Sequence, residues 1–216
     1  MTTLCLTPSN LTGTVEIPSS KSMGHRELIC AALAKGQSRI SNVSLSKDIL
    51  ATVQGLKALG AHLSQEQLQE GRATFLVEGK ELKIVNPRID CGESGSTLRF
   101  LLPLAASCRQ PVTFLGGGKL PMRPLDPYFT IFQEQGLAFT KGTEANLPLT
   151  IQGPLQPGKF MVPGNVSSQF ISGLLFALPL LQGDSTLEIT ETLESKSYVT
   201  MTLAALQKYG IKIQEE

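Results

Sequence analysis

Three short segments bring hydroxyl side chains to the point where an apolar run, typical of a helix, begins. They are Pro18-Ser-Ser-Lys-Ser22, Gly92-Glu-Ser-Gly-Ser-Thr97 and Gly164-Asn-Val-Ser-Ser-Gln169. The first N–H groups of a helix have no partner within it and lie at the positive end of its dipole, so they bind anions. The intervals are 74 residues from Ser22 to Ser96 and 72 residues from Ser96 to Ser168. This regularity indicates a repeated unit whose polar ends converge on an anionic ligand.

Cationic side chains surround the first of these helix starts. Lys21 lies within the motif, and Ser22 and Arg26, four residues apart, share one helix face. Lysine and arginine beside a helix N-terminus form a strong site for phosphate or carboxylate. A solvated basic turn is the alternative, which the many hydroxyl donors of this motif disfavour. His25 is a candidate base, although a lone histidine on a helix is more often a surface or packing residue.

The second helix start combines backbone access with charge. Gly92 and Gly95 permit a ligand to approach the backbone closely, and Arg99 can point back toward the same helix start. Glu93 is a candidate acid or base. A carboxylate at this position also complements the helix dipole, and this is the interpretation that we favour.

Neutral donors dominate the third helix start and the segment before the last predicted helix. Ser167, Ser168 and Gln169 offer two hydroxyls and an amide, which is more than one N-cap needs. Ser195 and Tyr198 precede or open the last helix, where the tyrosine ring either stacks on a ligand or packs against the protein.

A glycine-rich segment at residues 116–119 resembles part of a nucleotide phosphate loop. The full pattern requires serine or threonine after Lys119, where this chain has Leu120, so the segment does not form a P-loop. Further along, Arg123 is followed directly by Pro124 in a predicted mobile loop. Its rigid setting favours a ligand clamp over a surface residue.

Composition limits the class of protein. With 216 residues, 41% hydrophobic and 17% charged, the chain is typical of a globular domain, and a net charge of +1 argues against nucleic acid as a partner. The four cysteines lack the C-x-x-C spacing, so we expect no metal site, no cofactor and no disulfide framework. A reduced cytoplasmic protein is the simplest interpretation. The longest apolar stretch, Phe170–Leu181, is shorter than the roughly 20 residues that span a bilayer, so it predicts a buried helix and no membrane partner.

Hydrophobic spacing predicts an α/β protein in which helix, strand, helix and further strands recur three times. The predicted helices cover residues 20–33, 48–59, 96–106, 125–135, 168–181 and 198–209. The predicted strands cover residues 38–43, 61–63, 73–77, 111–115, 137–140, 147–151, 185–189 and 211–213. The second helix of each unit closes on a glycine: Gly60, Gly136 and Gly210. Since the third unit lacks its last strand, we expect the chain to be part of a longer protein.

These motifs together resemble the enolpyruvyl transferases, and within them the branch that uses shikimate 3-phosphate. The most specific segments are Pro18–Arg26, Gly92–Arg99, Met122–Pro124, Val166–Phe170 and Ser195–Tyr198. The resemblance covers the whole chain but only about the N-terminal half of such an enzyme. It implies one α/β domain over residues 1–216, built from three βαβαββ-like units as an inside-out α/β barrel with buried helices. It also implies that residues 1–18 cross to a second, C-terminal domain absent from this chain.

The resemblance further implies a reaction, the transfer of the carboxyvinyl group of phosphoenolpyruvate to the 5-hydroxyl of shikimate 3-phosphate with release of phosphate. Lys21 would be catalytic, and the phosphoenolpyruvate contacts would be Lys21, Gly95, Arg123 and Gln169. Gly95 would also meet the inhibitor glyphosate. The shikimate 3-phosphate contacts would be Lys21, Ser22, Arg26, Ser167, Ser168, Gln169, Ser195 and Tyr198.

Two departures from the family pattern lie near this site, because Glu93 and Ser197 replace an asparagine and a proline that many members carry. The acid–base carboxylates and lysine of the family's second domain have no counterpart here. We therefore expect the isolated chain to bind shikimate 3-phosphate weakly and not to turn over. A UDP-N-acetylglucosamine enolpyruvyl transferase is one alternative, disfavoured by Ser22 and by the lack of cysteine in residues 115–124. A non-catalytic anion-binding module of the same repeats is the other.

Overall fold

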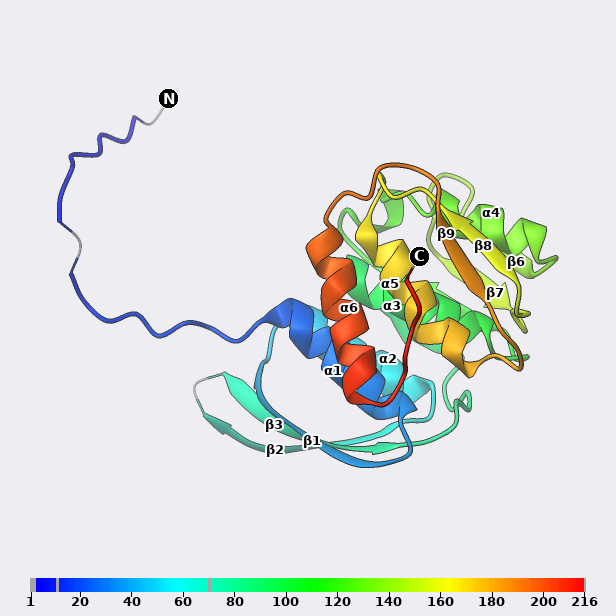
Figure 1. Cartoon of the computed structure of the whole chain (residues 1–216), viewed down its shortest axis with the longest axis horizontal. Coiled ribbons are helices and arrows are strands. Elements are labelled where there is room, and N and C mark those ends of the chain that lie inside the picture. Colours follow the sequence, from blue (N-terminus) through cyan, green and yellow to red (C-terminus); the bar gives the residue numbers. More distant parts are fainter. Residues whose placement is uncertain (1–2, 11, 70, 216) are drawn as a thin grey trace.

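The computed structural model describes residues 3–10, 12–69 and 71–215. Its main body places helices between a sheet on one side and two further sheets on the other (Figure 1). The α-helices are α1 (Lys21–Leu33), α2 (Lys47–Ala58), α3 (Gly95–Ala106), α4 (Asp126–Glu134), α5 (Ser168–Ala177) and α6 (Lys196–Lys208). Two short 3₁₀ turns are η1 (Leu120–Met122) and η2 (Leu178–Leu180). All six predicted helices are present, so the hydrophobic spacing located them correctly.

The strands form three separate sheets. The first has the antiparallel order β1-β3-β2, from β1 (Gly36–Ser44), β2 (His62–Gln69) and β3 (Arg72–Gly79). The second has the order β4-β5-β7-β6, from β4 (Arg88–Asp90), β5 (Val112–Leu115), β6 (Ala138–Lys141) and β7 (Leu149–Gln152). The third pairs β8 (Lys159–Val162) in parallel with β9 (Thr186–Ile189). The predicted α/β class is confirmed, while hydrogen bonds join the described strands into these three sheets and not into one closed barrel.

The repeated unit is most complete in the middle of the chain. There β4, α3, β5, α4, β6 and β7 follow one another, which is the implied βαβαββ order. The strands β4 and β8 were not predicted. Each is only three or four residues long and becomes a strand by pairing in parallel with β5 or β9.

Two predictions about elements were wrong. Residues 211–213 form no strand, because the Ile211 amide instead donates to the Leu206 carbonyl at the end of α6. The predicted helix over residues 168–181 stops at Ala177 and continues as η2, whose Pro179 has no N–H for an α-helical hydrogen bond.

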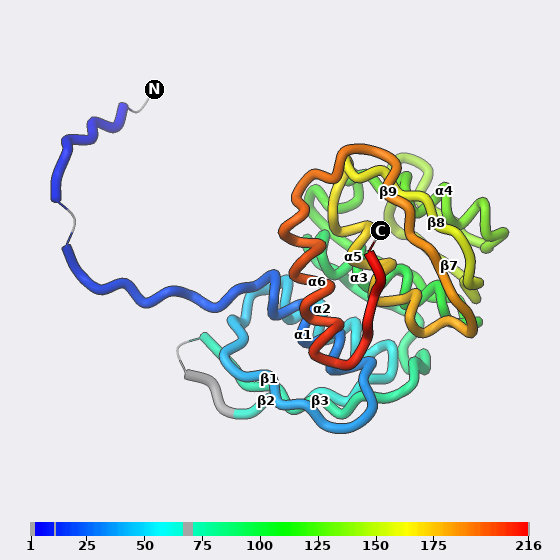
Figure 2. Tube along the Cα trace, in the orientation of Figure 1, coloured from blue at the N-terminus to red at the C-terminus, as the bar shows by residue number. Residues whose placement is uncertain are grey.

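The core centres on α3 and α5, which lie at the middle of the fold in both ribbon views (Figure 2). Every residue of α3 except Ser96 is buried. A helix that is apolar all round must be covered on all sides, and here other helices and the second sheet cover it. The Phe100 ring lies edge-on to the ring of Phe176 on α5, with 5.4 Å between centroids.

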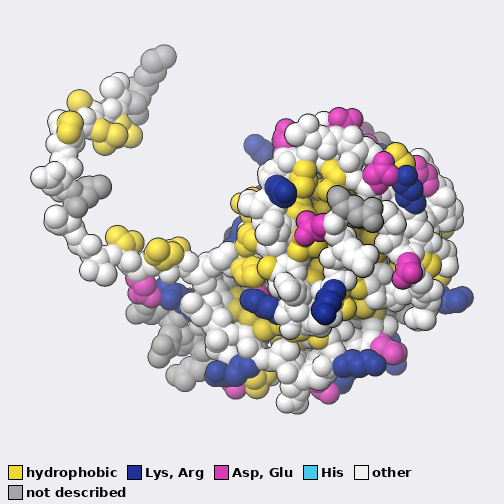
Figure 3. Space-filling view, in the orientation of Figure 1, with side chains coloured by type: hydrophobic (Ala, Val, Ile, Leu, Met, Phe, Trp, Pro, Cys, Tyr) yellow, Lys and Arg dark blue, Asp and Glu magenta, His cyan; other side chains and the backbone are white. Residues whose placement is uncertain are grey.

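The described N-terminal residues form an extended chain that leaves the main body (Figure 3). They carry four exposed apolar side chains, Leu4, Leu6, Val15 and Ile17. Glu16 on this segment pairs with Arg72 on β3 at 2.8 Å. Within the part of the chain that the structure describes, no helix has the length and hydropathy needed to cross a membrane.

Candidate functional site

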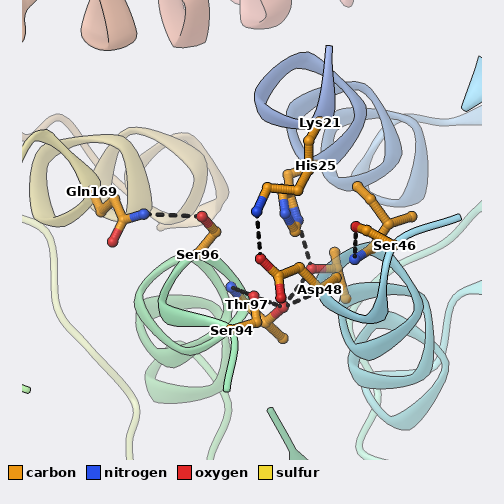
Figure 4. A network of polar contacts seen from close by, with 10 residues as sticks. Lys21, His25, Ser46, Asp48, Ser94, Ser96, Thr97 and Gln169 are labelled. Carbon is orange, nitrogen blue, oxygen red and sulfur yellow. Dashed lines mark hydrogen bonds and ion pairs between the residues drawn. The ribbon is translucent and has the colours of Figure 1, made fainter. Parts of the chain in front are cut away.

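The three predicted helix starts are the N-termini of α1, α3 and α5, and each is capped by a serine of its motif. Ser20, Ser94 and Ser167 accept hydrogen bonds from backbone N–H groups of the first turn at 3.1–3.3 Å. The starts of α1, α3 and α5 lie around a common centre, with the start of α2 beside them (Figure 4). Since the cap satisfies only one or two donors, the remaining N–H groups of each first turn are available to an anion.

Lys21 opens α1 and points across to α2. Its Nζ lies 2.6 Å from Oδ2 of Asp48 in the first turn of α2 (Figure 4). Half of the lysine side chain is exposed, and such a pair contributes at most about 1 kcal/mol. An incoming phosphate or carboxylate therefore competes readily with Asp48 for the ammonium group.

A buried chain of polar groups lies below this ion pair. His25 Nδ1 is 2.8 Å from Thr52 Oγ1, which is 2.7 Å from Thr97 Oγ1, and Thr97 donates to the Ser94 cap at 2.8 Å. Burial lowers the pKa of His25 to about 4. The imidazole is therefore neutral near pH 7 and serves as a packing residue that connects α1 to the cap of α3, not as a site cation.

Three polar side chains converge on Gly95, the first residue of α3. A Cβ at this position would lie 2.8 Å from Arg123 Nη1, 3.4 Å from Arg99 Nη1 and 3.5 Å from Gln169 Oε1. Burial lowers the pKa of Arg99, and the neighbouring charge of Arg123 lowers it further. Among the described residues, neither guanidinium forms a salt bridge with a carboxylate. Two adjacent cations without a counter-ion, beside a helix N-terminus and a bare backbone, suit a small polyanion.

The segment that carries Arg123 is tethered to the body at several points. It contains the turn η1, whose Leu120 is buried, and the Gly117 amide donates to the Gly92 carbonyl at 2.8 Å. Asn146 Nδ2 donates to the Arg123 carbonyl at 2.9 Å. The segment predicted as a mobile loop therefore has a defined path, and its backbone fixes where the Arg123 side chain begins.

Arg26 lies in the core and not on the surface of the site, since only 2% of it is exposed. Its guanidinium donates to Thr202 Oγ1 at 2.8 Å and to the carbonyls of Ser22 and Tyr198 at 2.7 and 3.0 Å. A longer contact of 3.4 Å reaches Ser172 Oγ. Burial lowers the pKa of Arg26 to about 10. Arg26 thus holds together α1, α5 and α6, and its predicted contact with shikimate 3-phosphate stays a prediction.

The remaining predicted residues lie at the starts of α1, α5 and α6. Ser22 is half-buried, Ser168 is buried at the start of α5, and Tyr198 is 44% exposed. Ser195 occupies the N-cap position of α6 with φ at +56° and makes no side-chain capping bond. Arg26 joins the Ser22 and Tyr198 carbonyls, which brings the starts of α1 and α6 together.

The sequence of the whole domain matches a known family. The family sequence model described as EPSP synthase (3-phosphoshikimate 1-carboxyvinyltransferase) covers residues 6–216. The chain belongs to the EPSP synthase family. It is 48% identical to the 3-phosphoshikimate 1-carboxyvinyltransferase of Clostridium novyi over 219 residues and 49% identical to that of Clostridium perfringens strain SM101 over 216 residues. In both comparisons 99% of this chain is covered, and the chain spans about half the length of these curated relatives.

Two solved structures share the fold of this chain. An EPSP synthase from Acinetobacter baumannii aligns with a TM-score of 0.77 at 24% identity, over 94% of this chain and 45% of that chain. The enolpyruvyl transferase NikO from Streptomyces tendae aligns with a TM-score of 0.60 at 19% identity, over 95% of this chain and 46% of that chain. These two likenesses concern the fold alone.

Two features of the candidate site were missed from the sequence. Asp48 is the ion-pair partner of Lys21, and Thr52 joins His25 to Thr97. The sequence does place Asp48 at the start of a predicted helix, but an acidic residue there is usually explained by its favourable interaction with the helix dipole. Thr52 carried no signal, because its partners lie on two other helices.

Proposed function

We propose that this chain supplies one half of the site of a 3-phosphoshikimate 1-carboxyvinyltransferase. The reaction moves the carboxyvinyl group of phosphoenolpyruvate to the 5-hydroxyl of shikimate 3-phosphate and releases phosphate, as in the shikimate route to aromatic amino acids. The observation that carries the proposal is the pair of guanidiniums of Arg99 and Arg123 beside Gly95, without a carboxylate partner in the described structure. Membership of the EPSP synthase family selects this reaction among those that use anions.

The geometry supports phosphoenolpyruvate at the start of α3. Gly95 leaves the backbone open there, Arg123 reaches the same point, and Gln169 lies beside it. Lys21 would contribute its ammonium group from α1 once an anion displaces Asp48. We assign these four residues to phosphoenolpyruvate, with Lys21 shared between both substrates as the catalytic residue.

Shikimate 3-phosphate would bind along the starts of α1, α5 and α6. The phosphate and hydroxyl groups of this ligand match the hydroxyl-rich turns there, and the exposed Tyr198 ring can cover an apolar ring face. The residues proposed for it are Lys21, Ser22, Arg26, Ser167, Ser168, Gln169, Ser195 and Tyr198.

Catalysis by such a site rests on preorganised charge. Both substrates are polyanions, and addition of the 5-hydroxyl to the vinyl carbon gives a tetrahedral species that carries phosphate and carboxylate. Fixed cations and helix N-termini stabilise that species without reorganisation at the moment of reaction. The acid–base groups would come from a second domain, so the chain alone would bind and not turn over.

The second domain is the partner that we propose for residues 1–18. Their exposed apolar side chains, with Leu4 at 87% and Leu6 at 92%, suit a strand added to another sheet. We also propose a cytoplasmic location, which the four free cysteines support, since two of them, Cys30 and Cys91, are buried as thiols.

Calorimetry on the purified chain tests the proposal. Shikimate 3-phosphate should bind, phosphoenolpyruvate should bind more tightly in its presence, and UDP-N-acetylglucosamine should not bind. Lys21→Ala should weaken the binding of both substrates, whereas Lys35→Ala, just beyond α1, should weaken the binding of neither. Tight binding of the UDP-sugar would favour the alternative transferase, and binding of neither substrate would favour a non-catalytic module.

A phosphate-release assay tests the division of the site. We expect no release by the chain alone, and release when it is mixed with the C-terminal half of the Clostridium novyi relative. Turnover by the chain alone would contradict the proposed need for a second domain.

A further inference from the structure

Arg99 contributes positive charge beside Gly95 without being assigned a substrate contact, and its guanidinium donates to Gln169 and to the carbonyl of the residue after Arg123. We propose that Arg99 is a positioning residue that fixes the orientation of the Gln169 amide, with its nitrogen toward Ser96, and that anchors the segment bearing Arg123. This inference rests on the proposed function, because Gln169 and Arg123 are proposed contacts of phosphoenolpyruvate. Part of its test uses no substrate, so the two can fail separately.

The Arg99 guanidinium has a fixed position inside the protein. Only 8% of the residue is exposed, and the guanidinium carbon lies 4.8 Å from the centre of the Phe170 ring. Nη1 donates to Gln169 Oε1 at 2.7 Å, and Nη2 donates to the Pro124 carbonyl at 3.0 Å. Its backbone carbonyl accepts from Tyr128 Oη at 2.6 Å. Because both the backbone and the guanidinium of Arg99 are held in place, this residue can impose an orientation on its partners.

The contact with Gln169 fixes the polarity of the amide. A guanidinium carries only donors, so the end of the Gln169 amide that faces Arg99 must be the oxygen. The nitrogen then lies at the opposite end, where Nε2 donates to Ser96 Oγ at 2.9 Å (Figure 4). The second N–H of Nε2 remains for a ligand. Oε1 lies on the Gly95 side of the amide, 3.5 Å from where a Cβ on Gly95 would be, so the amide can donate to a ligand only on its Ser96 side. A reversed amide would lose this donor and turn its NH₂ group toward the Arg99 guanidinium.

The contact with Pro124 acts on Arg123, the other proposed contact of phosphoenolpyruvate. Arg99 holds the carbonyl on one side of the Arg123–Pro124 segment, and Asn146 holds the Arg123 carbonyl at 2.9 Å. With both carbonyls anchored, the Arg123 side chain leaves the backbone from a fixed point and reaches Gly95. One buried guanidinium therefore bonds both the Gln169 side chain and the Pro124 carbonyl next to Arg123, and so fixes two segments that are far apart in the sequence.

Lysine cannot replace Arg99 in this role. A lysine ammonium is a single donor centre, so it can reach Gln169 or the Pro124 carbonyl, but it lacks the fork that bonds both. Methionine fills similar space and removes both bonds, so the Gln169 amide becomes free to reverse. Arg109, which is exposed beyond the end of α3, provides the matched control for both changes.

The first experiment follows the Gln169 side-chain amide by ¹⁵N–¹H NMR in the 216-residue chain without ligand, with the signal assigned by its loss in Gln169→Leu. In Arg99→Met we expect this signal to shift and its protons to exchange with water several times faster. In Arg109→Met we expect no change. An unaltered Gln169 amide signal in Arg99→Met would overturn the proposal.

The second experiment titrates the same chains first with shikimate 3-phosphate and then with phosphoenolpyruvate. We expect Arg99→Lys and Arg99→Met to raise the dissociation constant of phosphoenolpyruvate at least tenfold and that of shikimate 3-phosphate less than twofold. Equal weakening of both, with a lower melting temperature, would mean a merely structural role and would overturn the proposal. If the unmodified chain binds neither substrate, the proposed function fails, and the amide signal still decides the geometry of Arg99.

Discussion

Replacing Arg26 by methionine separates a structural role for this residue from a role in binding. The guanidinium makes four hydrogen bonds, to Ser22, Tyr198, Thr202 and Ser172, with 2% of the residue exposed. Each bond stabilises the fold by about 1 kcal/mol net, so their loss alone would cost about 4 kcal/mol.

Part of this cost is recovered in the variant. Ser172 Oγ and Thr202 Oγ1 remain 2.8 Å apart, and Thr202 Oγ1 still donates to the Tyr198 carbonyl at 3.0 Å. Removing a buried charge also relieves its desolvation. We therefore expect Arg26→Met to lower the free energy of unfolding by about 2 kcal/mol, which corresponds to about 4–8 °C in melting temperature.

Urea unfolding followed by circular dichroism measures this change. Arg26→Lys should lose at least as much stability, because the charge stays buried while the fork of donors is lost. Arg39→Met is the control, since Arg39 is exposed and forms its ion pair in the described structure with Glu66 on the surface. Unchanged stability in Arg26→Met together with lost shikimate 3-phosphate binding would refute the structural role and make Arg26 a ligand contact.

Two further predictions concern Gly95 and His25. Gly95→Ala should leave the melting temperature within about 2 °C, because the flexible end of the Arg123 side chain can move away from the added Cβ. It should weaken the binding of phosphoenolpyruvate about tenfold, as measured by calorimetry. Gly117→Ala, where a Cβ would meet no atom within 4 Å, should leave this binding unchanged. The pKa of His25 falls from 6.5 to about 4 on folding, so the unfolded chain binds the extra proton and stability should drop by up to about 3 kcal/mol as pH falls from 6.5 to 4. Urea midpoints against pH should lose this slope in His25→Gln and keep it in His62→Gln; equal slopes in both would contradict the argument.

Local patterns in the sequence were sufficient to place the helices. Apolar spacing and the glycines that follow α2, α4 and α6 are properties of one segment, so they can be read without the fold. The strands β4 and β8 could not be found in this way, because they depend on pairing with β5 and β9. For the same reason the predicted strand at residues 211–213 was wrong, since a β-branched pattern without a neighbour forms no ladder.

The residues of the candidate site likewise fall into those that local sequence patterns reveal and those that only the fold reveals. Residues in the helix-start motifs were recognisable because capping and anion binding use consecutive residues. The burial of Arg26 and the forked contacts of Arg99 depend on partners far away in the chain, such as Thr202 and Gln169. Neither the spacing of residues nor their types reveals whether an arginine faces a ligand or the protein interior.

The burial of every residue of α3 except Ser96 has a consequence for how the molecule opens. Amide protons of such a helix exchange with solvent only when the whole molecule unfolds, whereas exposed ends exchange through local fraying. The start of α6 is of the second kind, since Ser195 is exposed and makes no side-chain capping bond. In hydrogen–deuterium exchange the interior of α3, from Arg99 to Ala106, should therefore be the slowest region, and the Tyr198 side of the site among the fastest. A ligand that bridges the two sides should therefore slow exchange at the start of α6 and leave the interior of α3 unchanged.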